Sequence, residues 1–174
     1  GEDAISCMVI SPDGRRIANT QRENLGFPLK GFQLGDFNTS TGEVSNISNI
    51  IQCFYTMGVA FSIDGTKLYS SCGNGKLFQY NVSLNNIAAI VASEYLVATN
   101  SNYGRGAVQL GPDGKIYCTT GYNTSFYLDV IQNPNASGVA CGFLYNGLHL
   151  GKKAWLSLPN FLTDYLAPKK AAKI

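Results

Sequence analysis

The residues of this chain that could carry out chemistry are few, and the single histidine comes first. A nucleophilic mechanism needs a serine or cysteine with a general base beside it, and that base is normally a histidine. His149 stands alone in the stretch NGLHLG, and no serine lies in a GxSxG turn. We therefore expect His149 to be a partly buried strand or loop residue, and we expect no catalytic residues in this chain.

The cysteines could in principle bind a metal or form disulfides; they are Cys7, Cys53, Cys72, Cys118 and Cys141. They form no CxxC pair, whereas a structural zinc site needs cysteines and histidines clustered at short spacings. Each cysteine lies in or beside an apolar run, so we expect buried thiols, with one or two disulfides as the alternative in an oxidising compartment. We expect no metal site and no cofactor.

A binding surface is the other kind of site that the side chains allow, and the stretch ATNSNYGRGA is the best candidate for it. Amide, aromatic and guanidinium groups lie there in a glycine-flanked loop, and such loops commonly lie on a rim. Planar rings beside amide groups suit a surface glycan, because sugar C–H groups stack on the ring while the amides bond hydroxyls. The predicted ligand or partner site consists of Asn100, Asn102, Tyr103, Arg105 and Tyr122. Packing in the interior is the alternative role for the tyrosines of this half of the chain and for Trp155.

A sequence segment that occurs three times must form the structural elements that position these side chains. GVAFSIDGTKLYSS has close counterparts in CMVISPDGRRIANT and AVQLGPDGKIYCTT, and the last glycines of the turn tetrads, Gly14, Gly65 and Gly114, are 51 and 49 residues apart. In each tetrad the aspartate can bond its own backbone and the glycine accepts a positive φ, so each predicts a hairpin turn between two strands. A third strand is expected at GFQLGDFN, KLFQYNVS and SFYLDVIQ, and a fourth at EVSNIS, AAIVAS and VACGFLY.

Four antiparallel strands recurring every 40 to 50 residues indicate the blades of a β-propeller. We therefore predict an all-β partial propeller over residues 1–162, followed by a C-terminal tail or linker at 163–174. The predicted blades cover residues 4–52, 53–100 and 101–153, and the first strand of another blade covers 154–162. Closed propellers typically need 4 to 8 blades. We expect the remaining blades of a longer polypeptide, or a protein partner, to cover the open flank.

The acidic residues have structural explanations in this scheme. Asp13, Asp64 and Asp113 belong to the turn tetrads, and Asp36 and Asp129 each close a predicted third strand. The equivalent placement of the last two favours structural hydrogen bonds. The alternative is a ring of acids at one mouth of the propeller, which could bind calcium or a sugar.

An ordered set of motifs gives the chain a family resemblance. The succession SPDGRRIA, LGDFNTSTGEVSN, YTMGVAFSIDGTKLYSS, GKLFQYNVS, GAVQLGPDGKIYCTT, LDVIQNPNASGVACGF and LSLPNF resembles the propeller region of large surface proteins of gliding and related Bacteroidetes. Those proteins are exported by the type IX secretion system and carry a C-terminal sorting domain. The resemblance implies a secreted or cell-surface location and a role in adhesion or gliding motility.

Composition narrows the choice of function further. The chain has 174 residues, a net charge of +2 and scattered basic residues, which disfavours a nucleic-acid surface. No stretch approaches the roughly 20 apolar residues of a membrane span. We expect a non-catalytic propeller module that acts as a scaffold for adhesion, gliding motility or protein assembly. The alternatives are a carbohydrate-binding propeller and a catalytic one, of lactonase or lyase type, that uses a divalent cation.

Overall fold

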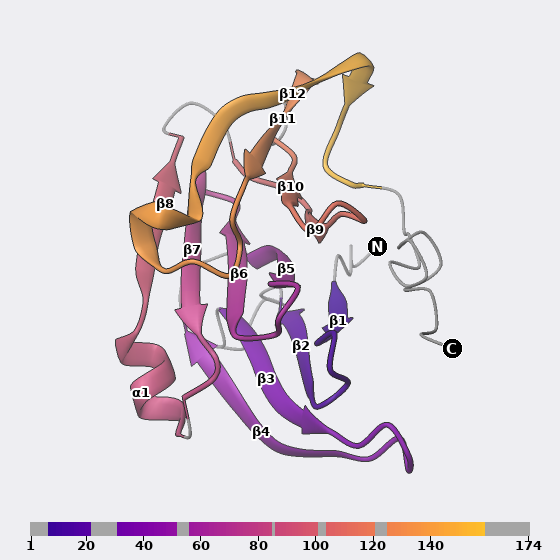
Figure 1. Ribbon diagram of the computed structural model, residues 1–174, viewed down its shortest axis with the longest axis vertical. Coiled ribbons are helices and arrows are strands. Elements are labelled where there is room, and N and C mark those ends of the chain that lie inside the picture. Colours follow the sequence, from indigo (N-terminus) through magenta and orange to yellow (C-terminus); the bar gives the residue numbers. More distant parts are fainter. Residues whose placement is uncertain are drawn as a thin grey trace, which may run out of the picture.

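Three four-stranded antiparallel sheets make up the computed structural model, which describes residues 7–21, 31–51, 56–84, 86–100, 104–120 and 125–158. Two short helices accompany the sheets in this part of the chain (Figure 1). In every sheet the spatial order of the strands follows their order along the chain, so each sheet is an up-and-down unit. We call the three sheets blades 1, 2 and 3. The expected all-β fold is confirmed.

The strands have the following bounds. Blade 1 consists of β1 (Met8–Ile10), β2 (Arg16–Gln21), β3 (Gly31–Phe37) and β4 (Val44–Ile51). Blade 2 consists of β5 (Thr56–Phe61), β6 (Lys67–Cys72), β7 (Lys76–Asn81) and β8 (Tyr95–Thr99), with helix α1 (Ile87–Ala92) before β8. Blade 3 consists of β9 (Val108–Leu110), β10 (Ile116–Cys118), β11 (Ser125–Ile131) and β12 (Phe143–Ala154), with the 3-10 helix η1 (Gly138–Cys141) before β12.

The repeated tetrads form the predicted hairpin turns. Gly14, Gly65 and Gly114 have φ angles of 71°, 72° and 78°, a region that side chains disfavour. The preceding aspartates bind the turn: Asp13 accepts a hydrogen bond from Ser11 Oγ at 2.6 Å, and Asp64 accepts one from Ser62 Oγ at 2.7 Å. The Ser11 hydroxyl holds the pKa of Asp13 below its usual value. The role predicted for these aspartates is confirmed.

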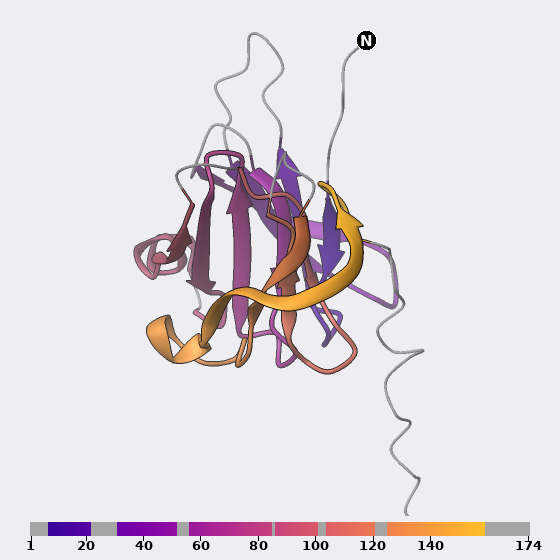
Figure 2. The same cartoon turned by 90° about the horizontal axis from the view of Figure 1, so that it is seen from above.

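Blade 2 lies between the other two blades, and its side chains alternate between them. The inner strand β5 contacts β1 and β2 on one side and β9 on the other. Val59 and Phe61 pack into the core shared with blade 1, whereas Ala60 packs into the core shared with blade 3. Viewed from above, the strands of blade 2 run between those of blades 1 and 3 (Figure 2). This arrangement gives two interfaces, blade 1–2 and blade 2–3.

The fourth strands differ from the prediction in two blades. The segment AAIVAS belongs to helix α1, and the fourth strand of blade 2 follows it as β8. The helix forms because alanine favours it and because Asn86 caps its first turn, with the side-chain oxygen accepting from Ala89 N at 2.8 Å. Ile90 anchors the helix in the blade 1–2 core. In blade 3 the start of VACGFLY lies in η1, and the strand begins at Phe143.

The strand predicted over residues 154–162 is not formed in the described part of that range. Ala154 is the last residue of β12, and residues 155–158 adopt no strand. The Leu156 carbonyl accepts hydrogen bonds from Ala107 N at 2.8 Å and from Thr119 Oγ1 at 3.2 Å. These bonds attach the segment to blade 3, and it pairs with no strand of a further blade among the described residues. Residues 159–162 and the predicted tail at 163–174 lie outside the described residues. Within the described residues, no helix has the length and apolar character that crossing a membrane requires.

Candidate functional site

The predicted binding loop contains a buried arginine. The structure describes Asn100 and Arg105 of the five predicted residues, whereas Asn102, Tyr103 and Tyr122 lie outside the described residues. Arg105 is only 1% exposed, so the expectation that its guanidinium lies on an exposed rim is wrong. Asn100 is half-buried, and its backbone N–H donates to Gly75 O at 3.0 Å.

Arg105 is buried because it joins blade 2 to blade 3. Its Nε donates to Gly75 O at 2.9 Å, and its Nη1 forms an ion pair with Asp129, which is also 1% exposed. The second oxygen of Asp129 accepts from Asn146 N at 2.8 Å, and the ring of Phe143 lies 5.0 Å from the guanidinium carbon. A charge removed from water needs such partners. The geometry therefore assigns Arg105 to the blade 2–3 interface.

Asp36 and Asp129, for which the sequence predicted equivalent positions in their blades, lie at different positions. Asp36 pairs in register with Arg16 near the end of its strand, and its carboxylate accepts from Asn46 Nδ2 at 2.7 Å. Asp129 pairs with Cys118 in the middle of blade 3 and is buried. Each of the two carboxylates makes a structural hydrogen bond. The prediction that Asp36 and Asp129 occupy equivalent blade positions, on which the alternative of a ring of acids depended, is wrong. Among the described residues, no group of three metal-ligating side chains gathers.

The cysteines and the histidine lie in different environments. Cys118 and Cys141 are buried free thiols, as expected, and burial raises the pKa of Cys118 to about 12. Cys72 is disulfide-bonded, which is the alternative that the sequence left open. His149 is exposed on β12, where its ring contacts Phe126 and Tyr127, so the expectation of partial burial is wrong.

A large hollow in the described part of the chain lies on the outer side of blade 3. It has a volume of about 540 Å³, and apolar side chains dominate its wall. Leu128 is buried at its base, whereas Leu148 and Trp155 line it and remain exposed, Trp155 by 62%. The long strand β12 arches over this side of the blade (Figure 1). An apolar hollow of this size indicates a surface that another structural unit covers.

The strand registers show what kind of surface this is. On blade 2, the residues that face blade 3 are Ala60, Tyr69, Leu77 and Gln79. The same register positions on blade 3 hold Gln109, Tyr117, Leu128 and Val130, which we call the forward face. The forward face of blade 3 thus repeats the face by which blade 2 packs on its neighbour. The sequence contains a signal for this equivalence, because Tyr69 follows the turn glycine Gly65 by four residues and Tyr117 follows Gly114 by three.

The backbone at Leu156 repeats a contact of the blade 2–3 interface. Ser71, in the second strand of blade 2, donates its hydroxyl to Gly106 O at 2.5 Å, just before β9 begins. Thr119, just after the second strand of blade 3, donates its hydroxyl to Leu156 O. A Cβ atom on Gly106 would lie 2.5 Å from Leu156 O, so only glycine allows this approach. Leu156 therefore stands where the chain would enter a further blade.

Solved structures place this arrangement among known folds. The WD40 repeats of RRP9 match at a TM-score of 0.52, with 13% sequence identity over 89% of this chain and 42% of that chain. The luciferin-regenerating enzyme matches at 0.50, with 14% identity over 86% of this chain and 48% of that chain. The PQQ domain of pyranose dehydrogenase from Coprinopsis cinerea matches at 0.51, with 14% identity over 75% of this chain and 34% of that chain.

The chain folds as a partial β-propeller. Identities this low show the fold alone, and the chain spans less than half the length of each of these three matches. No protein-family model and no curated protein matches the sequence. The contacts between the three blades, and the face of blade 3 beside the apolar hollow, are therefore the features on which function can be argued.

Proposed function

We propose that this chain is a non-catalytic propeller module of a large secreted or cell-surface protein, and that it acts as a scaffold for adhesion, gliding motility or protein assembly. In this role, further blades of the same polypeptide, or a protein partner, cover the forward face of blade 3. The sequence motifs that resemble type IX-secreted surface proteins motivate the location.

The observation that carries the proposal is the apolar hollow beside the forward face of blade 3, where Leu128 and Val130 are buried, Gln109 and Tyr117 are half-buried, and Leu148 and Trp155 are exposed. The forward face repeats the face by which blade 2 packs on blade 3, yet it borders this hollow of about 540 Å³. A propeller ring normally needs at least four blades to close. Among the described residues no further blade packs on this face, and a face of this kind relies on the next unit for burial.

Two further observations support the non-catalytic and extracellular parts of the proposal. The buried Asp129 is neutralised by Arg105, and His149 contacts aromatic rings, so neither is placed as an acid or base beside a nucleophile. Cys72 is disulfide-bonded, and disulfides persist mainly in oxidising compartments.

The association state of the chain tests the open face. We expect the isolated chain to self-associate and to bind a hydrophobic dye, and we expect the double variant Leu148→Asp, Trp155→Asp to do both much less. Val139→Asp is the matched control, because Val139 is 86% exposed on η1 and does not line the hollow. A chain that stays monomeric and binds no dye, with no difference between the variants, would contradict the proposal.

The location is tested separately in the cells that produce the protein. An antibody against the chain should label intact cells, and on a denaturing gel it should detect a polypeptide well above 18.7 kDa. Labelling that appears only after permeabilisation would contradict the surface location. A band at 18.7 kDa from an unassociated protein would contradict the module interpretation.

A carbohydrate-binding role is a second candidate, and exposed aromatic rings favour it. Phe126, Tyr127 and His149 form a contiguous cluster on β11 and β12, and Lys153 Nζ lies 5.5 Å from the Phe126 ring centre. Exposed rings beside hydrogen-bond donors are suited to sugar stacking. Binding to a panel of soluble oligosaccharides that Tyr127→Ala abolishes would support this role, and unchanged binding would contradict it.

A further inference from the structure

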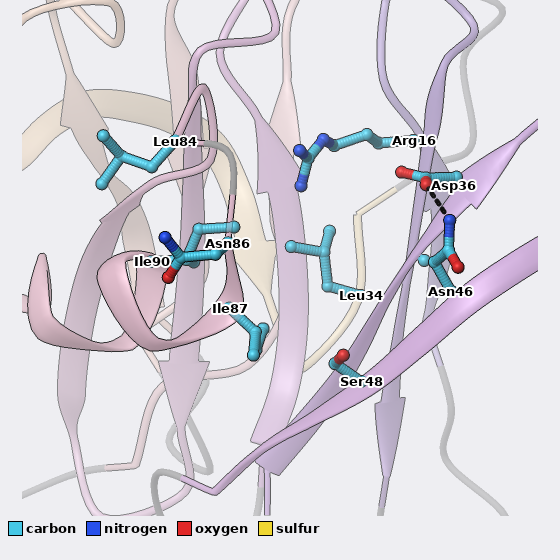
Figure 3. A pocket seen from close by; sticks show the side chains of 10 residues that line it. Arg16, Leu34, Asp36, Asn46, Ser48, Leu84, Asn86, Ile87 and Ile90 are labelled. Carbon is cyan, nitrogen blue, oxygen red and sulfur yellow. Dashed lines mark hydrogen bonds between the residues drawn. The ribbon is translucent and has the colours of Figure 1, made fainter.

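A second kind of hollow lies at the blade 1–2 interface, between helix α1 and the β3–β4 hairpin. It has a volume of about 260 Å³. Figure 3 shows side chains entering it from both blades: Arg16 and Leu34 from blade 1, and Leu84, Asn86 and Ile87 from the α1 region of blade 2. We call it the Arg16 hollow. Helix α1 builds its wall, and neither of the other blades has such an α-helix among its described residues.

Arg16 contributes to this hollow a cation that has no partner among the described residues. The residue is half-buried, and its guanidinium makes no hydrogen bond or ion pair with any described residue. Its register partner Asp36 is a candidate counter-ion, but the two are not within ion-pair distance, and the Asp36 carboxylate accepts from Asn46 instead. A guanidinium that is partly removed from water and lacks a partner favours a carboxylate ligand, which it can bind through two parallel hydrogen bonds.

The opposite wall is apolar. Leu34 and Ile90 are almost fully buried at the hollow, and Leu84 and Ile87 complete a patch of aliphatic side chains around them. Figure 3 shows the Arg16 guanidinium reaching over Leu34 toward this patch. A ligand that fills the space must therefore offer carbon atoms to the aliphatic side chains as well as charge to Arg16.

Polar groups around the hollow favour an acceptor as ligand. The oxygen of Asn86 is used by the helix cap, so its amide nitrogen is left as a donor. Ser48 adds a hydroxyl from β4. The lining of the hollow thus offers two donors besides the Arg16 cation, and its one carboxylate, Asp36, already accepts from Asn46, so the hollow suits the oxygens of a carboxylate better than an ammonium group.

A larger hollow adjoins this one and sets the direction in which a ligand could extend. It has a volume of about 450 Å³ and shares Arg16 and Asp36 with the first. Its other acids, Asp13 and Asp64, are engaged by the hydroxyls of their own turns. A carboxylate carried on a longer chain, such as an acidic side chain of a peptide, could extend from the first hollow into the second.

We propose that the Arg16 hollow binds a carboxylate carried on a short aliphatic chain, with Arg16 as the residue that pairs with it. The carboxylate comes either from a free short-chain acid or from an aspartate or glutamate side chain of a protein ligand. This site lies at the blade 1–2 interface, so it does not depend on how the forward face of blade 3 is covered.

The test is an NMR titration of the whole chain with four probes. Sodium butyrate and butyramide form one pair, and the peptides acetyl-Ala-Glu-Ala-amide and acetyl-Ala-Gln-Ala-amide form the other. With at least one of the two carboxylates, we expect saturable shifts of the backbone amide signals of Leu34, Ile87 and Ile90 and of the Arg16 Nε–H signal. The dissociation constant for the matching amide probe should be about tenfold higher. Tighter binding of the glutamate peptide identifies a protein ligand, and tighter binding of butyrate identifies a free acid.

Two variants make the proposal falsifiable. Arg16→Gln should weaken binding about tenfold, whereas Arg15→Gln, which changes an exposed arginine at the adjoining hollow, should leave it within about twofold. Ile87→Glu adds a carboxylate to the lining of the Arg16 hollow from an exposed helix position and should block binding even if Arg16→Gln misfolds. Equal binding of acid and amide, unchanged binding in both Arg16→Gln and Ile87→Glu, or absence of any shift at these residues with both carboxylates would overturn the proposal.

Discussion

The two interfaces between blades are built in different ways. Between the described residues, a single hydrogen bond crosses the blade 1–2 interface, from Cys7 Sγ to Val59 O at 3.9 Å. The blade 2–3 interface is crossed by several, including those that Tyr69 and Gln79 make with the loop before η1 and with Gly138 at the start of η1. It also contains the buried ion pair of Arg105 and Asp129.

The comparison shows that a shared fold leaves room for different interfaces. Both interfaces have an apolar core that the alternation along β5 produces. The blade 1–2 interface combines its core with two hollows and an arginine that has no charged partner among the described residues, which leaves space for a ligand. The blade 2–3 interface instead joins buried polar groups of the two blades by hydrogen bonds and an ion pair, which holds the blades in one arrangement, although Arg105 Nη2 is a buried donor without a partner among the described residues. A ligand site and a rigid junction thus occur side by side in one repeat array.

The largest effect should come from breaking the ion pair of the blade 2–3 interface. Arg105→Met should lower the free energy of unfolding by about 3–5 kcal/mol, because it leaves the Asp129 carboxylate buried without a counter-ion. Urea denaturation measures this change. Lys115→Met is the matched control: it removes an exposed ion pair with Asp113 at 3.7 Å, and should change stability by less than about 1 kcal/mol. Similar losses in both variants would contradict the assignment of Arg105 to the interface.

Leucine truncations compare the packing of the two cores. Leu77→Ala, in the blade 2–3 core, should cost about 4–5 kcal/mol, because the leucine is fully enclosed. Leu34→Ala, in the blade 1–2 core, should cost about 2–3 kcal/mol, because Leu34 already borders a hollow and its loss creates less new cavity. Thermal and urea unfolding provide both values. If Leu34→Ala costs more than Leu77→Ala, the comparison between the interfaces fails.

Removal of one hydroxyl from each of two equivalent tyrosines gives a smaller effect. Tyr69→Phe should cost about 1–2 kcal/mol, because the buried hydroxyl donates to Pro134 O at 2.8 Å and accepts from Gln79. Tyr117→Phe should cost about 0.5 kcal/mol, because that hydroxyl donates to Asp113 in an exposed turn. Equal costs would show that the blade 2–3 hydrogen bonds add nothing beyond those of a turn.

Thiol labelling sharpens the comparison without changing the protein. Cys7 lies half-buried at the blade 1–2 interface, whereas Cys118 and Cys141 are buried in the blade 2–3 core. Burial raises the pKa of Cys118 to about 12, so very little of the reactive thiolate forms at pH 8. Peptide mapping after iodoacetamide treatment should find Cys7 modified first, and the other two modified only after denaturation. Early modification of Cys118 would mean that the blade 2–3 interface opens readily.

The repeat and its turns could be predicted because their signals are local. Each tetrad needs an aspartate beside a glycine with positive φ, and the first three strands around it alternate in the sequence. Helix α1 was missed because a short run of alanine and isoleucine fits a buried strand as well as a helix. The cap at Asn86 was the available signal, since asparagine followed by such a run favours a helix start.

The candidate sites depended on contacts that the sequence does not reveal. Arg105 was expected on a rim, but it precedes β9, its partner Asp129 lies 24 residues away on β11, and no local pattern connects the two. The Arg16 hollow exists because α1 approaches the β3–β4 hairpin from the next blade. Neither contact could be inferred without knowing how the blades stack.

The meander order of the strands has a mechanical consequence. When the two ends of the chain are pulled apart, the load reaches each blade through one connecting segment and is resisted by the side chains at its junctions with neighbouring blades. Among the described residues, one hydrogen bond joins blade 1 to blade 2, whereas an ion pair and several hydrogen bonds join blade 2 to blade 3. Blade 1 should therefore detach first under tension, while blades 2 and 3 remain joined. Such a module would lengthen in two stages when pulled.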